Sequence, residues 1–466
     1  MKTKWLYLMA SLHAIACSTS THHLPTAERW VTYADKTKLL SKQPNIPFSS
    51  VAKTASIIQI DTGITYQTID GFGYTLTGGS AQLIQQKISD KNREALLKEL
   101  FHASGMGISY LRISIGSSDL DEKVFSYDDL PNGQSDEDLE HFSLKPDRLY
   151  LVPTLQQILQ INPSIKLMAS PWSAPAWMKN NQSPKGGSLL PRYYDSYANY
   201  FVKYLQGMKA EGITIDAITI QNEPEHPGNL PSMTMTSNEQ LEFIKSHLGP
   251  AFKTHQITTK IIIYDHNCDH PEYPLAILSD KAAKKYIDGT AFHLYLGDVN
   301  ALKKVHELHP DKNIYFTEQW TSGHGDFGVD LAWHVKNLII GAMRNWSRTV
   351  LEWNVASDEN YNPHTPQGGC TLCQGAITIN SATGKIERNV SYFIIAQAAK
   401  FLPPGSIRIF SSEVAELPNV AFITPEQKKV LIVLNDSADE KKIAIKYNGS
   451  FLNMSLPAKG VASIVF

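Results

Sequence analysis

The sequence has no excess of charge of either sign. Among its 466 residues, 43 are lysine or arginine and 45 are aspartate or glutamate, so the formal net charge at pH 7 is −2. A protein that binds nucleic acid normally presents a strongly basic face. The balanced charge therefore indicates no nucleic-acid partner.

Cysteine is also scarce, with four residues in the whole chain. A structural zinc site needs about four ligands, and the single Cys-x-x-Cys pair, Cys370 and Cys373, has no second pair to complete one. In an exported protein these two cysteines are better interpreted as a small loop disulfide. The polar stretch His266–His270 matches no metal-binding spacing, and we interpret it as a loop that follows a strand. The sequence therefore predicts no metal.

Long apolar runs, Gly-rich phosphate loops and internal repeats are missing too. A membrane-spanning helix needs about 20 apolar residues, and the run from Trp5 to Leu12 is far too short. Without a Gly-rich loop, a nucleotide cofactor has no recognisable binding motif. We therefore expect no organic cofactor.

Residues 1–17 have the features of an export signal. Two lysines among the first four residues precede the apolar run, and small residues follow it. The end at Cys17 resembles a bacterial lipoprotein cleavage site, where a lipidated cysteine would attach the protein to a membrane. Alanine at position 14, where leucine is usual, argues against that, so plain cleavage stays open. Either way we expect export: a secreted, periplasmic or outer-membrane-anchored protein.

From residue 68 to 401 the sequence alternates short apolar stretches with segments of helical periodicity. Eight such stretches with helical crossovers over roughly 300 residues are the pattern of a (β/α)₈ barrel. The predicted helices include Ser80–His102 and Tyr193–Glu211. The predicted strands are Gly71–Thr77, Ser109–Ile115, Lys166–Trp172, Ala217–Asn222, Lys260–Asp265, Thr290–Tyr295, Asn313–Glu318 and Thr349–Asn354.

Residues 402–466 have a different character. Four short strands separated by turn residues, from Ser406 to Tyr447, predict a small all-β domain. Because this segment is thin for a β-sandwich, we expect residues 18–67 to be a linker followed by strands that join it. The predicted architecture is an α/β barrel with a β-sandwich built from both ends of the chain.

Two glutamates end predicted strands of this barrel. Glu223 follows the fourth strand and Glu318 ends the seventh. Ligands bind at the carboxyl ends of barrel strands, so the two carboxylates should face one substrate. Glycoside hydrolysis with retention needs two carboxyl groups roughly 5 Å apart, one as nucleophile and one as general acid/base. A single glutamate in a loop is usually only a solvated surface residue, but two at strand ends of this rank are better explained by catalysis.

An ordered set of motifs runs along the chain from Gly71 to about Ser411. The motifs are Gly71-Phe-Gly73, Leu111-Arg-Ile-Ser114, Ala169-Ser-Pro-Trp-Ser-Ala-Pro175, Gln221-Asn-Glu-Pro224, His293-Leu-Tyr295, Phe316-Thr-Glu-Gln-Trp320 and Trp353-Asn354. This set resembles the glucosylceramidase family, glycoside hydrolase family 30, in its bacterial-type members.

The resemblance implies roles for these residues. Glu223 would be the acid/base and Glu318 the nucleophile, with Arg112 holding the nucleophile ionised. A structural ion pair for Arg112 and a core position for His293 are the alternatives. The other residues that match substrate-binding positions of the family are Asp119, Trp172, Asn222, His293, Tyr295 and Trp353.

The resemblance also implies the activity. The expected reaction is hydrolysis of a β-glucoside or glycolipid, foremost glucosylceramide, to glucose and ceramide. Hydrolysis of β-1,6-glucan, known from relatives in the family, is the alternative, and a non-catalytic surface protein that binds carbohydrate or glycolipid is a third. The departures Thr77-Gly-Gly-Ser80 and the loop from Asn362 to Cys373 leave the carboxylate pair intact but put the substrate in question. The oligomeric state stays open.

Overall fold

The structure is a computed structural model that describes residues 26–466. The predicted export signal, residues 1–17, and Cys17 lie outside the described residues. Within the described part, no helix has both the length and the apolar character that crossing a membrane requires.

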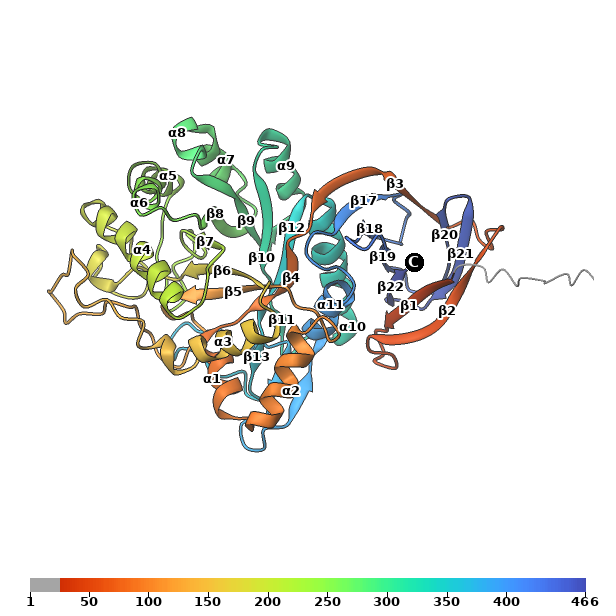
Figure 1. Cartoon of the computed structure of the whole chain (residues 1–466), viewed down its shortest axis with the longest axis horizontal. Helices are drawn as coiled ribbons and strands as arrows, with labels where there is room; N and C mark the ends of the chain where they lie inside the picture. The colour runs from red at the N-terminus through yellow and green to blue at the C-terminus, as the bar shows by residue number, and fades with distance from the viewer. Residues whose placement is uncertain (1–25) are drawn as a thin grey trace, which may run out of the picture.

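Eight parallel strands close into a barrel, which confirms the predicted fold (Figure 1). The strands are short and mostly buried, because a parallel sheet is covered on both faces. Thr349 of the last strand pairs with Gly71 of the first and closes the ring. The barrel strands are β4 (Gly71–Thr75), β5 (Tyr110–Ile115), β6 (Lys166–Pro171), β7 (Ala217–Thr219), β8 (Lys260–Cys268), β9 (Ile287–Gly297), β10 (Asn313–Glu318) and β12 (Ser347–Asn354).

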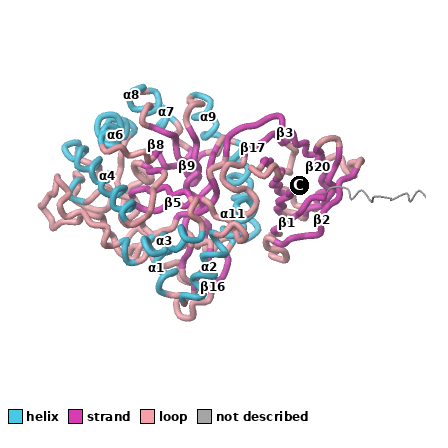
Figure 2. The backbone as a smooth tube through the Cα atoms, in the orientation of Figure 1, coloured by secondary structure: helices cyan, strands magenta, loops and turns pink. Residues whose placement is uncertain are grey.

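Helices surround the barrel strands (Figure 2). Their apolar faces and the outer faces of the strands form one continuous core. The helices are α1 (Gly78–Gln86), α2 (Asp90–Phe101), α3 (Leu151–Ile161), α4 (Tyr194–Ala210), α5 (Ser237–Glu242), α6 (Gly249–Thr254), α7 (Glu272–Ser279), α8 (Lys281–Lys284), α9 (Asn300–Leu308), α10 (Phe327–His334) and α11 (Val390–Ala399). Two π-helical segments, Phe243–Leu248 and Val335–Ala342, continue α5 and α10.

The predicted helix Ser80–His102 is wrong in one respect, because it is two helices. α1 ends at Gln86, and Ser89 begins α2 by accepting a hydrogen bond from the main-chain N–H of Asn92. A serine at this position satisfies one of the N–H groups that a helix start leaves without a partner. The cap therefore starts a new helix where periodicity alone predicted a continuous one.

Seven buried side chains fill the part of the barrel near the amino ends of its strands. Each comes from a different strand, and the layer consists of Tyr110, Met168, Ala217, Ile262, Ala291, Tyr315 and Leu351. The eighth strand, β4, contributes Gly73, where a Cβ atom would lie 1.9 Å from the main-chain oxygen of Tyr110. The barrel is thus a packed core, and ligands are expected at the carboxyl ends of its strands.

A β-sandwich of nine strands stands beside the barrel (Figure 1). Three of the strands precede the barrel in sequence, as predicted, and six follow it; the sequence analysis missed β21 and β22. The strand order closes on itself, so no sheet edge is left open. The strands are β1 (Thr26–Thr32), β2 (Ser41–Ser49), β3 (Ile57–Thr68), β17 (Ile407–Ser411), β18 (Asn419–Ile423), β19 (Lys429–Leu434), β20 (Lys441–Tyr447), β21 (Ser450–Leu456) and β22 (Val461–Val465).

Two small sheets lie in the loops after β10 and β12. They tie these loops together next to the carboxyl ends of the barrel strands. Their strands are β11 (Thr321–Ser322), β13 (Ala356–Ser357), β14 (Cys373–Gln374), β15 (Ile377–Ile379) and β16 (Ile386–Arg388).

A buried glutamine joins the barrel to the sandwich. Gln397 on α11 is fully buried, and its Nε2 donates to Thr32 Oγ1 of β1 at 2.7 Å. The Ser463 hydroxyl of β22 lies 2.6 Å from Gln397 Oε1 and 2.6 Å from its main-chain oxygen. All three side chains are buried, so each depends on the others for its hydrogen bonds.

Gln397→Ala is expected to destabilise the protein. It leaves the Thr32 and Ser463 hydroxyls with fewer partners and opens a cavity, so the free energy of unfolding should fall by about 2–4 kcal/mol. Urea denaturation followed by circular dichroism measures the change. The matched control is Gln156→Ala, which removes an exposed glutamine with a single 2.9 Å hydrogen bond to the Glu211 main chain and should change stability by less than about 0.5 kcal/mol. Equal losses in both variants would contradict the role of Gln397.

Candidate active site

A cavity of about 360 Å³ lies at the carboxyl ends of the barrel strands. Two features recur among the side chains around it: carboxylates at strand ends, and aromatic rings in the loops that follow. The lining residues are Asp119, Trp172, Glu223, His226, Asn229, His266, Asn267, Tyr295, Leu296, Glu318, Trp320, Trp353, Cys370 and Cys373.

A larger cavity of about 660 Å³ lies at the amino ends of the strands. Its carboxylates are engaged in ion pairs: Asp70 with Arg348 at 2.7 Å and Asp216 with Lys166 at 2.8 Å. Residues at the amino ends of barrel strands contribute to stability, whereas catalytic residues lie at the carboxyl ends. The smaller cavity is therefore the candidate active site.

Arg112 of β5 lies at the base of this cavity and is fully buried. Its Nη1 donates to Glu318 Oε2 at 2.5 Å, and its Nη2 donates to Asn222 Oδ1 at 2.6 Å and to Asp265 Oδ2 at 2.8 Å. Its guanidinium lies 4.8 Å from the centre of the Trp172 ring. Burial opposes the charge, but Asp265 and Glu318 raise the pKa of Arg112 further, so it stays a cation.

Glu223 reaches the cavity through an unusual backbone turn. The predicted strand Ala217–Asn222 ends earlier, at Thr219, because Asn222 N–H bonds to Pro171 O at 2.8 Å and Glu223 N–H to Asp265 O at 3.0 Å. Glu223 has φ = 47°, in the left-handed region. A residue with a Cβ atom avoids this region, so the surrounding hydrogen bonds must hold the turn that aims the carboxylate inward.

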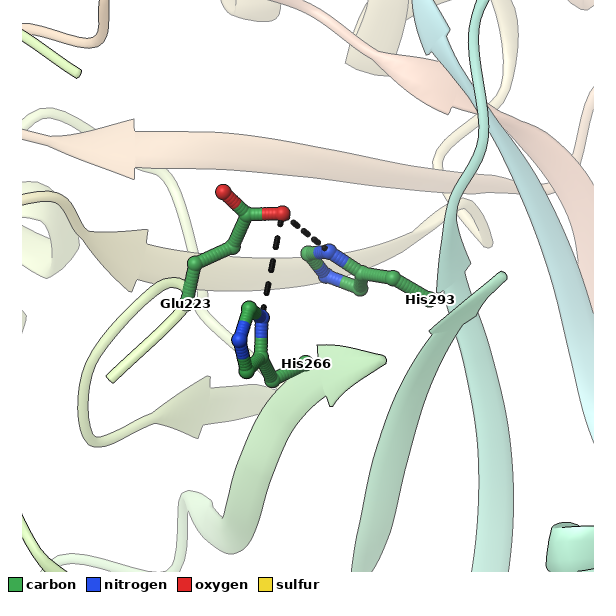
Figure 3. Close-up of side chains that lie close together, drawn as sticks. All are labelled: Glu223, His266 and His293. Carbon is green, nitrogen blue, oxygen red and sulfur yellow. Dashed lines mark hydrogen bonds and ion pairs between the residues drawn. The ribbon is translucent and has the colours of Figure 1, made fainter. Parts of the chain in front are cut away.

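Glu223 and Glu318 meet at one imidazole. His293 Nδ1 lies 3.2 Å from Glu223 Oε1, and 3.8 Å from Glu318 Oε1 (Figure 3 shows the first contact). These two distances hold the carboxylate oxygens at most about 7 Å apart. Retaining glycosidases place their carboxyl groups about 5–5.5 Å apart and inverting ones about 6.5–9.5 Å apart. The arrangement accommodates the first spacing and excludes most of the second.

Charge around His293 and Asp265 is strongly perturbed. Burial disfavours a charged His293, but Glu318, Asp265 and Glu223 together raise its pKa to about 9. Burial also acts to raise the pKa of Asp265, yet Arg112 and His293 hold it well below its usual range. Near neutral pH the base of the cavity therefore carries Arg112 and His293 as cations and Asp265 as an anion.

The two glutamates differ in the donors that face them. Glu318 accepts hydrogen bonds from Arg112 and, at 2.8 Å, from the Tyr295 hydroxyl. Glu223 accepts from Asn229 Nδ2 at 3.3 Å and faces His293. Burial raises the pKa of Glu318, although the charges of His293 and Arg112 oppose the rise. Burial acts on Glu223 in the same sense, but the hydrogen bond and charge of His293, followed by the charges of His266 and His226, lower the pKa of Glu223.

The remaining predicted residues surround the same cavity. Trp172 and Trp353 pack with their ring centres 5.4 Å apart, and among the described residues the Trp172 Nε1 has no hydrogen-bond partner. Asp119 is buried beside the disulfide that joins Cys370 and Cys373, and accepts from the Cys370 N–H at 3.2 Å. Burial, followed by the charge of Glu318, raises the pKa of Asp119 to about 8.

Sequence reasoning missed Asp265 and His266. Asp265 accepts hydrogen bonds from Arg112 and His293 and from three buried hydroxyls, those of Ser170, Thr219 and Thr317. It ends an apolar run, as Glu318 does, and that shared pattern was the available signal. His266 lies in strand β8, which continues to Cys268; the predicted polar loop is therefore wrong at its start.

Lys179 was missed as well. It is fully buried, and its Nζ donates to Ser173 Oγ and to the Ser232 main-chain oxygen, both at 2.8 Å. It therefore ties the loop after Trp172 to the loop that follows Glu223. No carboxylate within the described part of the chain pairs with it, and burial lowers its pKa to about 7.

Among residues 26–466, two groups of side chains have the composition to hold a metal ion. In each, one ligand atom per residue lies within 4.8 Å of the others. One group, Asp128, Asp136 and His141, is outside the cavity. The other, Glu223, His266 and His293, lies inside it (Figure 3).

Comparison with known proteins identifies the family. Residues 69–402 match the family described as "Glycosyl hydrolase family 30 TIM-barrel domain", and residues 405–464 match "Glycosyl hydrolase family 30 beta sandwich domain". The chain belongs to glycoside hydrolase family 30. It is thus a glycosidase by family, as its sequence motifs predict.

Several members of family 30 resemble this chain over most of its length. An endo-1,6-β-D-glucanase of Neurospora crassa is 32% identical over 84% of this chain and 86% of its own. The lysosomal acid glucosylceramidase of Mus musculus is 26% identical over 84% of this chain and 79% of its own. The solved structure of an endo-β1,6-glucanase aligns with a TM-score of 0.88 at 33% identity, covering 94% of this chain and 99% of that one.

Lys179 gives this family 30 protein a testable dependence of stability on pH. The pKa of its amine is about 7 when folded and about 10.4 when unfolded. Between these values the unfolded chain binds more protons, so stability rises with pH, and below pH 7 this contribution is flat. The free energy of unfolding of the wild type, relative to Lys179→Met, should therefore rise from pH 7 to 10. Lys185→Met, at an exposed lysine of the same loop, should track the wild type. A constant difference for Lys179→Met would show that its amine titrates normally.

Proposed function

We propose that this protein is an endo-acting β-1,6-glucanase that hydrolyses its substrate with retention of configuration. The observation that carries the proposal is the placement of Glu223 and Glu318 around the single His293 Nδ1, at 3.2 and 3.8 Å, inside a cavity at the carboxyl ends of the strands. This spacing suits a nucleophile and a general acid/base acting on one glycosidic bond.

In the proposed reaction, Glu318 attacks the anomeric carbon while Glu223 gives its proton to the departing oxygen. A covalent glycosyl-enzyme forms on Glu318, and Glu223 then removes a proton from the water that hydrolyses it. The donors described above favour this division of roles. Arg112 and the Tyr295 hydroxyl stabilise a charged Glu318, which leaves Glu223 as the group that transfers the proton during the reaction.

The aromatic and acidic residues around Glu318 would bind the sugar that is cleaved. Trp172 Nε1 is buried without a partner among residues 26–466, and a sugar hydroxyl would satisfy it. Asp119, with its raised pKa, has a proton to donate to a second hydroxyl at neutral pH. Asn222 uses its Oδ1 on Arg112 and keeps its Nδ2 for the substrate.

The surroundings of Glu223 support a sugar as the leaving group. The general acid faces the departing group, and the cavity wall near Glu223 is polar: His226, Asn229, His266 and Asn267 line it. Polar side chains suit the hydroxyls of a glucose unit better than the apolar chains of ceramide.

The relatives support the same substrate. Three fungal endo-1,6-β-D-glucanases are 31–32% identical to this chain, whereas the mouse glucosylceramidase is 26% identical. The sequence motifs favoured glucosylceramide as the main substrate, and these comparisons support the alternative, β-1,6-glucan, better. Glucosylceramide therefore becomes the second candidate.

Substrate choice is tested by incubating the protein with a linear β-1,6-glucan and, separately, with glucosylceramide. The expected products are oligosaccharides of mixed length from the glucan and little glucose from the lipid. Proton NMR during the first turnovers should show the β-anomer of the new reducing end. Glucose released only from the lipid would make glucosylceramide the substrate. An α-anomer would rule out retention. No hydrolysis of either substrate would favour a protein that only binds carbohydrate.

The assigned roles are tested by Glu223→Gln and Glu318→Ala. Each should lower kcat for β-1,6-glucan by about 10²–10⁴-fold or more, because a proton donor or the nucleophile is lost. Glu225→Gln is the matched control, since Glu225 lies two residues away and pairs with His270 at 3.0 Å. It should retain activity within about twofold. Full activity in either site variant would overturn the assignment.

A further inference from the structure

Glu223, His266 and His293 bring three metal-binding atoms together inside the cavity (Figure 3). Glu223 Oε1 lies 3.2 Å from His293 Nδ1 and 3.8 Å from His266 Nδ1. All three side chains are buried, and they come from the loop after β7 and from the neighbouring strands β8 and β9. We propose that this cluster binds Zn²⁺ and that the bound ion inhibits the enzyme.

The distances fit a tetrahedral ion. Zinc forms bonds of about 2.0–2.1 Å to imidazole nitrogen and carboxylate oxygen, which places two ligands of a tetrahedral ion about 3.4 Å apart. The separations of 3.2 and 3.8 Å lie on either side of this value. The protein ligands are two imidazoles and one carboxylate, and water takes the fourth position of the tetrahedron.

The imidazoles are oriented for binding. His293 Nε2 faces Asp265 Oδ1 at 3.1 Å, and a carboxylate behind a histidine fixes the ring and leaves the other nitrogen for a metal. His266 Nδ1 is buried, and nothing in the described part of the chain forms a hydrogen bond with it. A buried polar atom normally has a partner, and an ion bound in the cavity would provide one for His266 Nδ1.

The choice of zinc follows from the ligand types. Mg²⁺ and Ca²⁺ prefer oxygen ligands, whereas imidazole nitrogens favour Zn²⁺ and its transition-metal neighbours. When Zn²⁺ binds, the His293 Nδ1 proton that faces Glu223 passes to solvent, which leaves a neutral imidazole and an ionised carboxylate as ligands. The ion then occupies Glu223, so no general acid/base is left to act on a glycosidic bond.

Binding and inhibition are measured separately, because the inhibition rests on the proposed function and the binding does not. Zinc chloride is titrated into the purified enzyme against a chromophoric chelator, and hydrolysis of β-1,6-glucan is followed in parallel. One equivalent of Zn²⁺ should bind and lower activity at least about tenfold, EDTA should restore it, and Mg²⁺ should have no effect.

His266→Asn should weaken Zn²⁺ binding by about tenfold or more. His270→Asn is the matched control, since His270 lies four residues away on the exposed surface and pairs with Glu225; its Zn²⁺ affinity should stay within about twofold of the wild type. Glu223→Gln, which keeps the shape of the side chain, provides a second variant if His266→Asn does not fold, and it should weaken binding similarly.

Three outcomes decide the matter. Zinc bound equally well by wild type and His266→Asn places the ion elsewhere, for example at Asp128, Asp136 and His141, and overturns the inference. An active enzyme that binds no zinc also overturns it and leaves the proposed function standing. An inactive protein that binds zinc through His266 keeps the metal site and removes the proposed function.

Discussion

The site depends on the fully buried positive charge of Arg112. A guanidinium removed from water is tolerated only when anions and hydrogen-bond acceptors surround it. Here Glu318, Asp265 and Asn222 supply them, each from a different strand end. The same contacts fix the positions of Glu318 and of Asn222, the residue before Glu223. They also bind Asp265, which in turn orients His293. One cation on β5 therefore fixes the relative positions of β7, β8, β9 and β10 where the chemistry takes place.

Much of the fold followed from the sequence, because barrel strands are short apolar runs and the helices between them keep their period. All eight barrel strands were predicted, and so were Glu223 and Glu318 as residues at strand ends. Asp265 was recognised only as the end of a strand. The role of Asp265 depends on which side chains of the neighbouring strands lie beside it. The register between strands decides that, and the sequence pattern of a single strand carries no information about register. The backbone turn at Glu223 was equally hidden, since its φ of 47° is imposed by hydrogen bonds to β6 and β8.

The polar side chains that begin at His266 do not mark the end of strand β8. A run of polar residues after an apolar strand usually marks a loop, yet in this barrel the strand continues to Cys268. Polar side chains on the last residues of a barrel strand face a cavity instead of bulk water, so they do not signal the end of the strand. The same reasoning explains why substrate choice could not be derived. The carboxylate pair is common to many glycosidases, whereas the wall beside Glu223 is formed by loops whose conformations depend on distant contacts such as that of Lys179.

The closed strand order of the sandwich has a consequence for how the chain folds. Glu28 of β1 pairs with Val465 of β22, roughly 440 residues later. During synthesis β1 and β2 can pair with each other, but their partners β22 and β21 emerge only after the whole barrel has been made. Until the last strand arrives, β1 and β2 present open edges that can pair with other chains. The ordering of events, barrel first and sandwich last, makes the interval before completion the time at which this protein is most exposed to aggregation and to chaperones.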